Sequence, residues 1–391
     1  MPFEGEWKDA ALEPIQEVSS MIYTGIDVHK KICAVCVKDE KGRVLHQFQI
    51  QNTREGIGVL LTTLRGKEAS VVMESTSTLW IKLYDALEEE GIPVVLANPY
   101  KIRVIAEGTL KNDKVDAAIL ADLLRADMVP SSFVPEKGAR ELKELIRYRQ
   151  IIKGQTTAIK NRIHSVLNKY DLTFEGTDLF GKKGLAWLRA VIPQLKKVDS
   201  FVLGEELAHL DHFSETLDKI EGDIAQQAVE REDVHLLMSI TGVDFFTALL
   251  FLCEVGDISR FPTPSHLSSW IGLVPRVHQS GDTLYHGKIT KQGNKLVRWA
   301  LVQAAHAAVR WDPQIASFYN RIASRKGKKK AIVAVARKLS VIIYHMLKKG
   351  EKYYYLNSTT YVRKLKRLCR LAGVSPNQLR MAVTKPVMVS S

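Results

Sequence analysis

Strand-like and helix-like segments alternate between residues 21 and 130, and this alternation limits the folds open to the chain. Short runs of apolar and β-branched residues predict three strands joined by tight turns, then two strands that alternate with helices. We expect the strands at 22–28, 32–38, 44–51, 70–73 and 93–96. We expect the helices at 53–65 and 79–90, after Pro99 and after Asp113. The pattern therefore predicts an α/β domain with a mixed sheet.

The chain after this domain is predicted to be helical. Between 137 and 232, apolar residues recur mostly at steps of three, four and seven in two arms, with a glycine-containing break at 171–184. Two such arms favour an antiparallel helical hairpin with a coiled-coil seam, which either holds domains apart or dimerises the protein. Segment 236–261 then resembles a helix-hairpin-helix, with a tight turn at 241–243 that offers backbone amides to a phosphate. A glycine-rich loop that is poor in strand signals follows, and further helices come after it.

The predicted fold class is therefore α/β plus all-α. An N-terminal mixed sheet with helices precedes a central helical hairpin and a C-terminal, mainly helical domain. The expected divisions are a disordered extension at 1–20, the α/β domain at 21–130, the hairpin at 131–233, the C-terminal domain at 234–350 and a basic tail at 351–391.

The positive charge of the chain is concentrated in one region. The net charge is +13, and residues 288–370 hold 21 Lys and Arg against only Asp312 and Glu351. Tryptophans and tyrosines are interleaved with these cations, as binding a phosphate backbone and stacking exposed bases would require. The alternative is a solvated lysine-rich surface. Binding to a membrane surface is disfavoured, because the cations are spread over several predicted helices.

Other functional classes are disfavoured by what the sequence lacks. It contains no apolar run of membrane-spanning length, and its acidic first twenty residues do not resemble a signal peptide, so we expect a cytoplasmic protein. Cys33 and Cys36 form a CxxC, but it lies in an alternating strand that sends the two side chains to opposite faces. We therefore expect no metal or redox role for this pair.

Four carboxylates stand at the ends of predicted elements of the α/β domain. Asp27 lies near the end of the first strand among apolar residues, where an unpaired carboxylate is costly to bury unless it meets a cation. Glu74 directly follows a short buried strand, and Asp113 and Asp116 share one face of a helix start. Together they predict a site for one or two Mg²⁺ ions, which can activate an attacking oxygen and stabilise a leaving one.

Each of these acids taken alone is also compatible with an ordinary surface or capping role. This applies above all to Asp113, because it stands where a helix cap is expected. Asp122 is a weaker candidate, since its offset of six residues from Asp116 turns it away. The predicted strand order is that of the ribonuclease H superfamily, an analogy of fold that says nothing about chemistry.

The motifs around these acids resemble those of the DEDD-type insertion-sequence transposases, which are bridge-RNA-guided recombinases. The resemblance is carried by GIDVHK, MESTS and KNDKVDA, and far downstream by GLVPRVHQSG and GKITKQGNKLVR. It implies a RuvC-like domain in which Asp27, Glu74, Asp113 and Asp116 bind the metal. It also implies that Ser280, just before a glycine, is a second catalytic element. Family members often carry two serines there, whereas this chain has Gln279 in the first place.

The same resemblance implies a function. A guide RNA encoded by the element would pair with donor and target DNA, while homodimers of the protein assemble to a tetramer. Ser280 would attack a DNA phosphate to form a covalent phosphoserine, with the acids of a neighbouring subunit completing the site. The rival interpretations are a RuvC-like Holliday-junction endonuclease that uses water and a non-catalytic RNA-binding protein.

Basic residues close to Ser280 and in the helices after it are candidates for contacts to RNA or DNA. Those near the serine are also candidates for clamping the charge that develops on the phosphate during attack. The candidates are Arg276, Lys288, Lys291, Lys295, Arg298, Lys328, Lys329 and Lys330.

Overall fold

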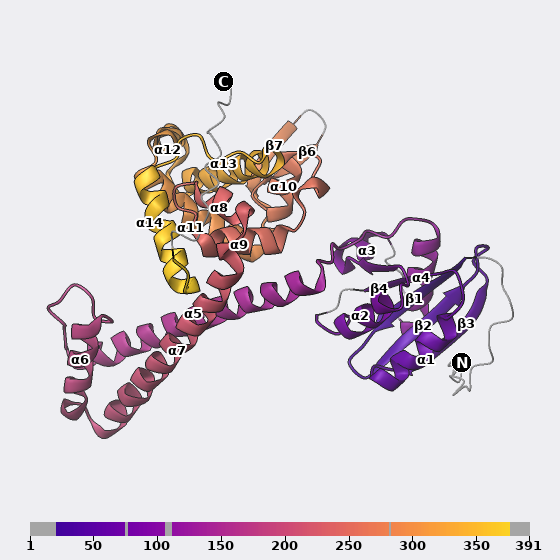
Figure 1. Cartoon of the computed structure of the whole chain (residues 1–391), viewed down its shortest axis with the longest axis horizontal. Helices are drawn as coiled ribbons and strands as arrows, with labels where there is room; N and C mark the ends of the chain where they lie inside the picture. The colour runs from indigo at the N-terminus through magenta and orange to yellow at the C-terminus, as the bar shows by residue number, and fades with distance from the viewer. Residues whose placement is uncertain (1–20, 75–76, 106–111, 281–282, 376–391) are drawn as a thin grey trace. The chain divides into compact units, whose positions relative to one another are not determined.

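The computed structural model describes residues 21–74, 77–105, 112–280 and 283–375 (Figure 1). The chain divides into two compact units between Val134 and Pro135. The first unit is α/β and the second is helical apart from a two-stranded ribbon, which confirms the predicted mixture of an N-terminal sheet and a mostly helical remainder. The predicted extension at 1–20 and the end of the predicted tail at 376–391 lie outside the described residues.

The first unit is built on a five-stranded mixed sheet of order β3-β2-β1-β4-β5. Strand β1 pairs antiparallel with β2 and parallel with β4, β2 pairs antiparallel with β3, and β4 pairs parallel with β5. The strands are β1 Ile22–Val28, β2 Ile32–Lys38, β3 Val44–Gln51, β4 Ala69–Glu74 and β5 Val94–Ala97. All five predicted strands are present, and β1 lies at the centre of the sheet.

Helices cover both faces of this sheet. Their bounds are α1 Arg54–Leu64, α2 Ile81–Glu89, α3 Pro99–Ile105 and α4 Asp113–Arg125. Ile22 and Ile26 of β1 pack into the core with α1 and α2, so the alternate positions Gly25 and Asp27 face α4. The alternation also separates the CxxC cysteines: Cys33 packs with the α1–α2 core, while Cys36 packs against α4. The prediction that they lie on opposite faces is confirmed.

Helix α4 lies unusually close to β1, and a glycine permits this. A methyl carbon on Gly25 would lie 2.1 Å from the carbonyl oxygen of Ala117 and 2.5 Å from the amide nitrogen of Ala121. No side chain fits in that space, because the backbone of Ala117 and Ala121 and the Cβ of Leu120 already fill it. The first turn of α4 is thereby brought to the end of β1.

The second unit begins with two long helices that pack side by side. These are α5 Lys137–Asn168 and α7 Lys197–Val229. Arg149 pairs with Glu221 and Arg162 with Glu206, an order that makes the helices antiparallel. The predicted break between the arms contains part of a further helix, α6 Lys182–Val191, which a short 3₁₀ helix, η1 Ile192–Gln194, extends.

The remaining helices surround α9, which is buried around almost its whole circumference and forms the centre of this core. The elements are α8 Glu232–Met238, α9 Phe245–Val255, η2 Ile258–Arg260, α10 Pro264–Ile271, α11 Lys295–Trp311, α12 Pro313–Lys326, α13 Lys328–Lys349 and α14 Ser358–Ala372. Helix α14 packs against α7 and buries Leu365 and Leu368, although its segment was predicted only as a basic tail. Within the described residues no helix is both long enough and apolar enough to cross a bilayer.

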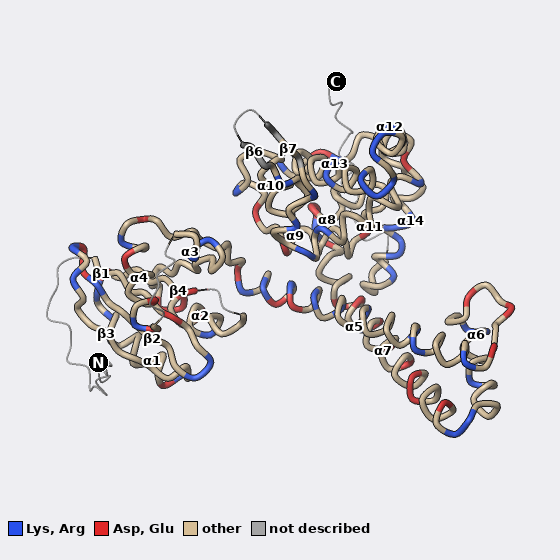
Figure 2. The backbone as a smooth tube through the Cα atoms, turned by 180° about the vertical axis from the view of Figure 1, so that it is seen from behind, with Lys and Arg blue, Asp and Glu red and all other residues tan. Residues whose placement is uncertain are grey.

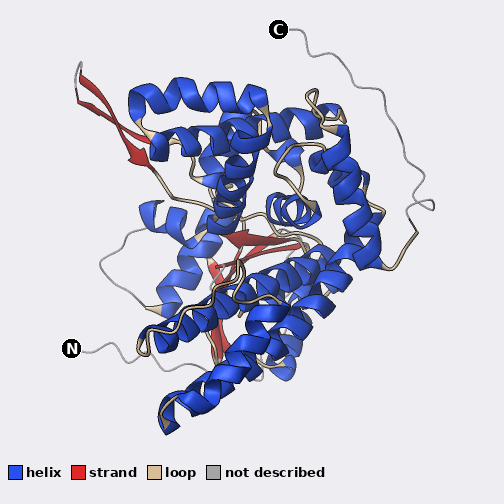
Figure 3. Ribbon diagram, turned by 90° about the vertical axis from the view of Figure 1, so that its left-hand side faces the viewer, coloured by secondary structure: helices blue, strands red, loops and turns tan. Residues whose placement is uncertain are grey.

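The glycine-rich segment after α10 was predicted to be a loop that is poor in strands, and this prediction is wrong. It contains an antiparallel ribbon of β6 Pro275–Ser280 and β7 Thr283–Ile289 (Figure 3). Within the described residues β6 and β7 pair only with each other, so they are not part of a larger sheet whose buried face would produce an alternating apolar pattern.

The close approach of α4 to β1 can be tested with Gly25→Ala. We expect this change to lower the free energy of unfolding by about 1–3 kcal/mol, because α4 must shift to admit the methyl group. The matched control is Gly58→Ala in the middle of α1, where an added methyl meets nothing within 4 Å. Better helix propensity should make the control neutral or more stable by up to about 1 kcal/mol. Equal denaturation midpoints for Gly25→Ala and wild type would contradict the packing argument.

Candidate metal centre and serine ribbon

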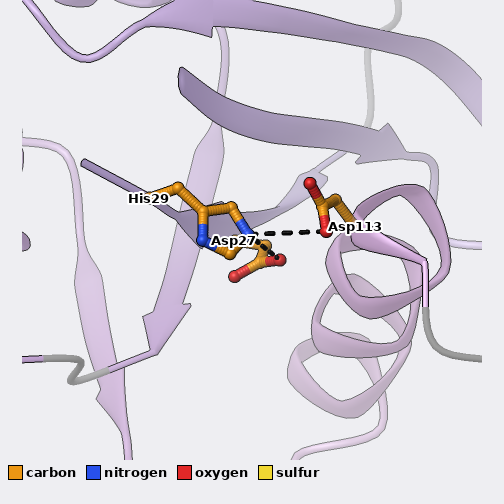
Figure 4. A group of neighbouring side chains, drawn as sticks. All are labelled: Asp27, His29 and Asp113. Carbon is orange, nitrogen blue, oxygen red and sulfur yellow. Dashed lines mark ion pairs between the residues drawn. The ribbon is translucent and has the colours of Figure 1, made fainter. Parts of the chain in front are cut away.

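Three side chains meet at the end of β1 (Figure 4). The imidazole Nε2 of His29 lies 3.1 Å from a carboxylate oxygen of Asp27 and 3.5 Å from one of Asp113. One potential ligand atom from each of the three lies within 4.8 Å of the others. The side chain of Asp27 is only 15% exposed, whereas those of His29 and Asp113 are about half exposed, at 53% and 52%. The group therefore has a buried floor and an open rim.

The other two predicted acids stand beside this group. Ile26 pairs with Met73 in the β1–β4 ladder, so Glu74 is the next residue of the strand adjacent to Asp27. Val72 faces α4, and the two-residue repeat of the strand places Glu74 on the same face. Asp116 belongs to the first turn of α4, as does Asp113. The structure thus brings all four acids to one edge of the sheet.

The start of α4 leaves its two acids available. Asn112 is the N-cap, and its side-chain oxygen accepts a hydrogen bond from the amide of Lys114. Asp113 is therefore not the capping residue, and that alternative is excluded. Asp113 and Asp116 both lie in the first turn, where acidic side chains interact favourably with the positive end of the helix dipole.

The surroundings of Asp27 favour the binding of a cation. Burial raises the pKa of Asp27, and the carboxylates of Asp113, Asp116 and Glu74 raise it further, opposed only by His29. A raised pKa means that the folded protein disfavours the charged form of this carboxylate. Hard carboxylate oxygens converging on one point are the ligands that Mg²⁺ and similar cations prefer. These residues therefore fit a divalent cation.

His29 was not among the predicted site residues. The signal that could have found it is its spacing: it stands two residues after Asp27 along an extended segment, so both side chains leave the same face. Asp122 was judged a weaker candidate, and it indeed serves elsewhere, since one of its carboxylate oxygens lies 2.6 Å from the ammonium of Lys38.

Ser280 is the last residue of β6, where it pairs with Thr283 across the turn of the ribbon. Its side chain, and both Gly281 and Asp282, lie outside what the structure describes. The root of the ribbon is held firmly. The amides of Thr290 and Lys291 donate to the carbonyls of Val274 and Gly272, respectively.

A buried carboxylate secures the segment that follows the ribbon. Glu254 of α9 is fully buried and accepts hydrogen bonds from Arg147 at 2.7 and 3.0 Å and from the amide of Asn294 at 2.7 Å. Lys143 lies 3.1 Å away. Burial raises the pKa of Glu254, but Arg147 and Lys143 hold it below its usual value, so the group is a stable anion. Asn294 in turn caps α11, so α5, α9 and α11 share one polar junction.

The predicted nucleic-acid contacts divide into two kinds. Those exposed to solvent are Arg276, Lys288, Lys291, Lys295, Lys328, Lys329 and Lys330. Arg298 is different, because it is only partly exposed and donates a hydrogen bond of 2.8 Å to the carbonyl of Ile271. Its position therefore also supports the end of α10, which precedes the ribbon.

Three lysines begin α13, immediately after two cations end α12 (Figure 2). A helix N-terminus already carries partial positive charge, so Lys328, Lys329 and Lys330 are unfavourably placed for the helix itself. A bound polyanion would offset this repulsion. The arrangement therefore favours a contact to phosphate over a merely solubilising surface.

Asp27→Asn tests two properties of the acid cluster: its effect on the stability of the metal-free fold and its ability to bind Mg²⁺. Because the folded pKa of Asp27 is raised, its ionisation destabilises the fold, and this penalty grows as pH rises from the unfolded pKa through the folded one. In EDTA at pH 8 we therefore expect Asp27→Asn to melt at the same temperature as wild type or higher. Added Mg²⁺ should stabilise wild type, by about 2.7 kcal/mol at one hundred times its Kd, and not the variant.

The control for this experiment is Asp127→Asn, which removes an exposed carboxylate of the same unit at a left-handed position that asparagine tolerates. It should respond to Mg²⁺ as wild type does. Equal stabilisation of Asp27→Asn by Mg²⁺ would mean that the cation binds elsewhere.

Comparisons with known proteins bear on both units. Residues 24–171 match a family model for DEDD transposases of the IS110 type, and residues 234–320 match the transposase IS116/IS110/IS902 family. The chain is 29% identical to the transposase for insertion sequence element IS1111A of Coxiella burnetii, over 84% of this chain and 90% of that protein. It is 25% identical to a pilin gene-inverting protein of Moraxella bovis, over 85% of this chain and 98% of that protein. This chain therefore belongs to the DEDD-type insertion-sequence transposases, enzymes that recombine DNA.

Proposed function

We propose that this transposase is an RNA-guided recombinase that joins donor and target DNA through a covalent phosphoserine intermediate. The observation that carries the proposal is the convergence on Asp27 of three carboxylates from two other segments: Glu74 from β4, and Asp113 and Asp116 from α4. The second support is the position of Ser280 at the end of β6, where it pairs with Thr283 of β7. The inversion of DNA implied by the name of the Moraxella relative is compatible with strand exchange.

We assign the first unit to the RuvC-like branch of the ribonuclease H superfamily. Support comes from the sheet order, with three antiparallel strands followed by two parallel ones and with acids at the ends of β1 and β4. The helix that supplies the remaining acids packs across the central strand. In this assignment the four acids and His29 form the rim and floor of one metal site.

The chemistry divides between the two units. The Ser280 hydroxyl attacks a DNA phosphorus, its proton leaves, a new P–O bond forms, and the bond to one deoxyribose oxygen breaks and leaves a free hydroxyl. A hydroxyl of the exchanging strand then attacks the phosphoserine and releases the serine, and this exchange gives a Holliday-type junction. Mg²⁺ bound by Asp27, Glu74, Asp113 and Asp116 supplies Lewis-acid stabilisation of the phosphate charge. The exposed Arg276 and Lys288 add positive charge on the ribbon itself.

Selection of the DNA is delegated to base pairing with a guide RNA, and the protein binds both nucleic acids through phosphates. Homodimers that pair into tetramers supply the acids of one subunit to the serine of another. A serine hydroxyl is a poor nucleophile on its own, which is why the proposal requires both sites. A water-using junction endonuclease would need the acids alone, and a non-catalytic RNA-binding protein would need neither.

Ser280→Ala is expected to abolish recombination between donor and target plasmids, since no other group replaces a covalent nucleophile. Wild type should form a protein–DNA adduct that survives denaturing electrophoresis, and the variant should not. The control is Ser324→Ala, which changes an exposed serine of α12 whose hydroxyl donates to the carbonyl of Arg321 in the same helix. Recombination or adducts that persist in Ser280→Ala would favour the water-using endonuclease.

Phosphate contacts at the start of α13 should make nucleic-acid binding depend on salt. Replacing Lys328, Lys329 and Lys330 by Gln should lower the slope of log affinity against log salt by about 2 to 3, because each lost phosphate contact removes about 0.9. The matched control replaces the exposed Lys182 and Lys183 of α6. An unchanged slope in the triple variant, or an equal loss in the control, would contradict the assigned contact.

A further inference from the structure

A cavity of about 690 Å³ lies in the second unit, away from the serine ribbon, among the α8–α9 turn, α11 and α14. Its volume is in the range of sites that hold small organic ligands and is far too large for a single inorganic anion. Its lining comes from three segments that are more than forty residues apart in the sequence, so no local motif marks it. No step of the proposed strand exchange uses it.

The floor of the cavity is rigid. Gly242, in the α8–α9 turn, lies so close to α11 that a methyl carbon on it would be 2.4 Å from the carbonyl oxygen of Ala304. The ammonium of Lys364, on α14, donates to the carbonyls of Met238, Ile240 and Val243 at 2.7 to 2.9 Å. The three elements are thus tied together, and the cavity exists before any ligand binds.

An aromatic ring and a cation stand at the edge of this cavity. Trp311, the last residue of α11, lines it and is 64% exposed. The guanidinium of Arg310 lies 5.1 Å from the centroid of this ring and covers one of its faces, so a base would stack on the other face. Arg363 lines it from α14 and is exposed, and within the described part of the chain no carboxylate pairs with it. Lys364 is occupied by the turn carbonyls, so Arg363 is the lining cation that remains available.

The remaining lining is polar and mixed in charge. Gln303, Thr359 and Thr360 bring amide and hydroxyl groups, and Asp244 brings one carboxylate. Helix α14 itself carries five basic residues and no acidic one. A carboxylate in the lining disfavours a ligand rich in carboxylates and suits the amino groups on the edges of bases. The combination of a flat ring, a cation and base-edge partners matches a nucleotide better than an acidic peptide.

We propose that this cavity binds one unpaired nucleotide of a single strand, with its base stacked on Trp311 and its phosphate paired with Arg363. The proposal rests on the proposed function only in requiring that the protein meets single-stranded RNA or DNA. The site is separate from the acid cluster and from Ser280, so it holds a strand without touching the reacting phosphate. Base–aromatic stacking of this kind tolerates any sequence and rejects a paired base.

The experiment measures binding of fluorescein-labelled oligouridylate, oligothymidylate, a duplex and an abasic oligomer of the same length. Trp311→Ala should weaken binding of one of the two single strands about tenfold and leave the duplex and the abasic oligomer unchanged. Arg363→Gln should weaken binding of the abasic oligomer too, and should lower the salt slope by about 0.7. Whether the loss falls on the RNA or the DNA strand identifies the source of the nucleotide.

Matched controls come from the same helices. Trp299→Ala removes another exposed ring of α11 and Lys366→Gln removes another cation of α14, and neither residue lines the cavity. Unchanged melting temperatures establish that Trp311→Ala and Arg363→Gln are folded. Three results would each overturn the proposal. They are equal losses of affinity in the variants and the controls, a loss of duplex binding in Trp311→Ala, and displacement of the single strand by polyglutamate. The experiment measures binding and not cleavage, so a negative result would leave the assignment of Ser280 intact. In the Ser280→Ala background, Trp311→Ala should still weaken binding of the single strand.

Discussion

The close contact between α4 and β1 positions the acid cluster of the first unit. Gly25 and the alanines of α4 let two backbones approach at a distance that no side chain permits. This approach carries the first turn of α4, with Asp113 and Asp116, to the end of the strand that bears Asp27. The acid cluster therefore depends on backbone packing between α4 and β1. A shift of α4 relative to β1 would change the distances between Asp27 and the two acids of α4.

The acid cluster gathers like charges that oppose its own stability. Burial and three neighbouring carboxylates raise the pKa of Asp27, so the folded chain disfavours the charge that a metal site needs. His29 lies among them and partly offsets the repulsion. Elsewhere the chain neutralises its buried charges: Glu254 has three polar partners, and Lys38 meets Asp122. The acid cluster therefore differs from these structural ion pairs in that its carboxylates lie close to other carboxylates, and such clusters are frequent at functional sites.

The second unit is organised differently, around a hydrophobic helix and a few polar junctions. Helix α9 is buried on nearly all sides, and Glu254 on it secures both α5 and the start of α11. Lys364 performs a similar task for the α8–α9 turn. Beyond these junctions, β6 and β7 pair with each other as a two-stranded ribbon, and a cavity lies beside Trp311.

Sequence alone determined the five strands, the helical hairpin arms, the opposite faces of Cys33 and Cys36 and the four acids at element ends, because each follows from a local period of two or from helical steps. Tertiary structure decided the rest. His29 belongs to the cluster because β1 ends beside α4. Strands β6 and β7 pair with each other outside the main sheet, and α14 packs against α7, which lies more than a hundred residues away in the sequence. The cavity beside Trp311 is lined by three segments that are far apart in the sequence. Contacts between such segments produce no periodic pattern from which the sequence could predict them.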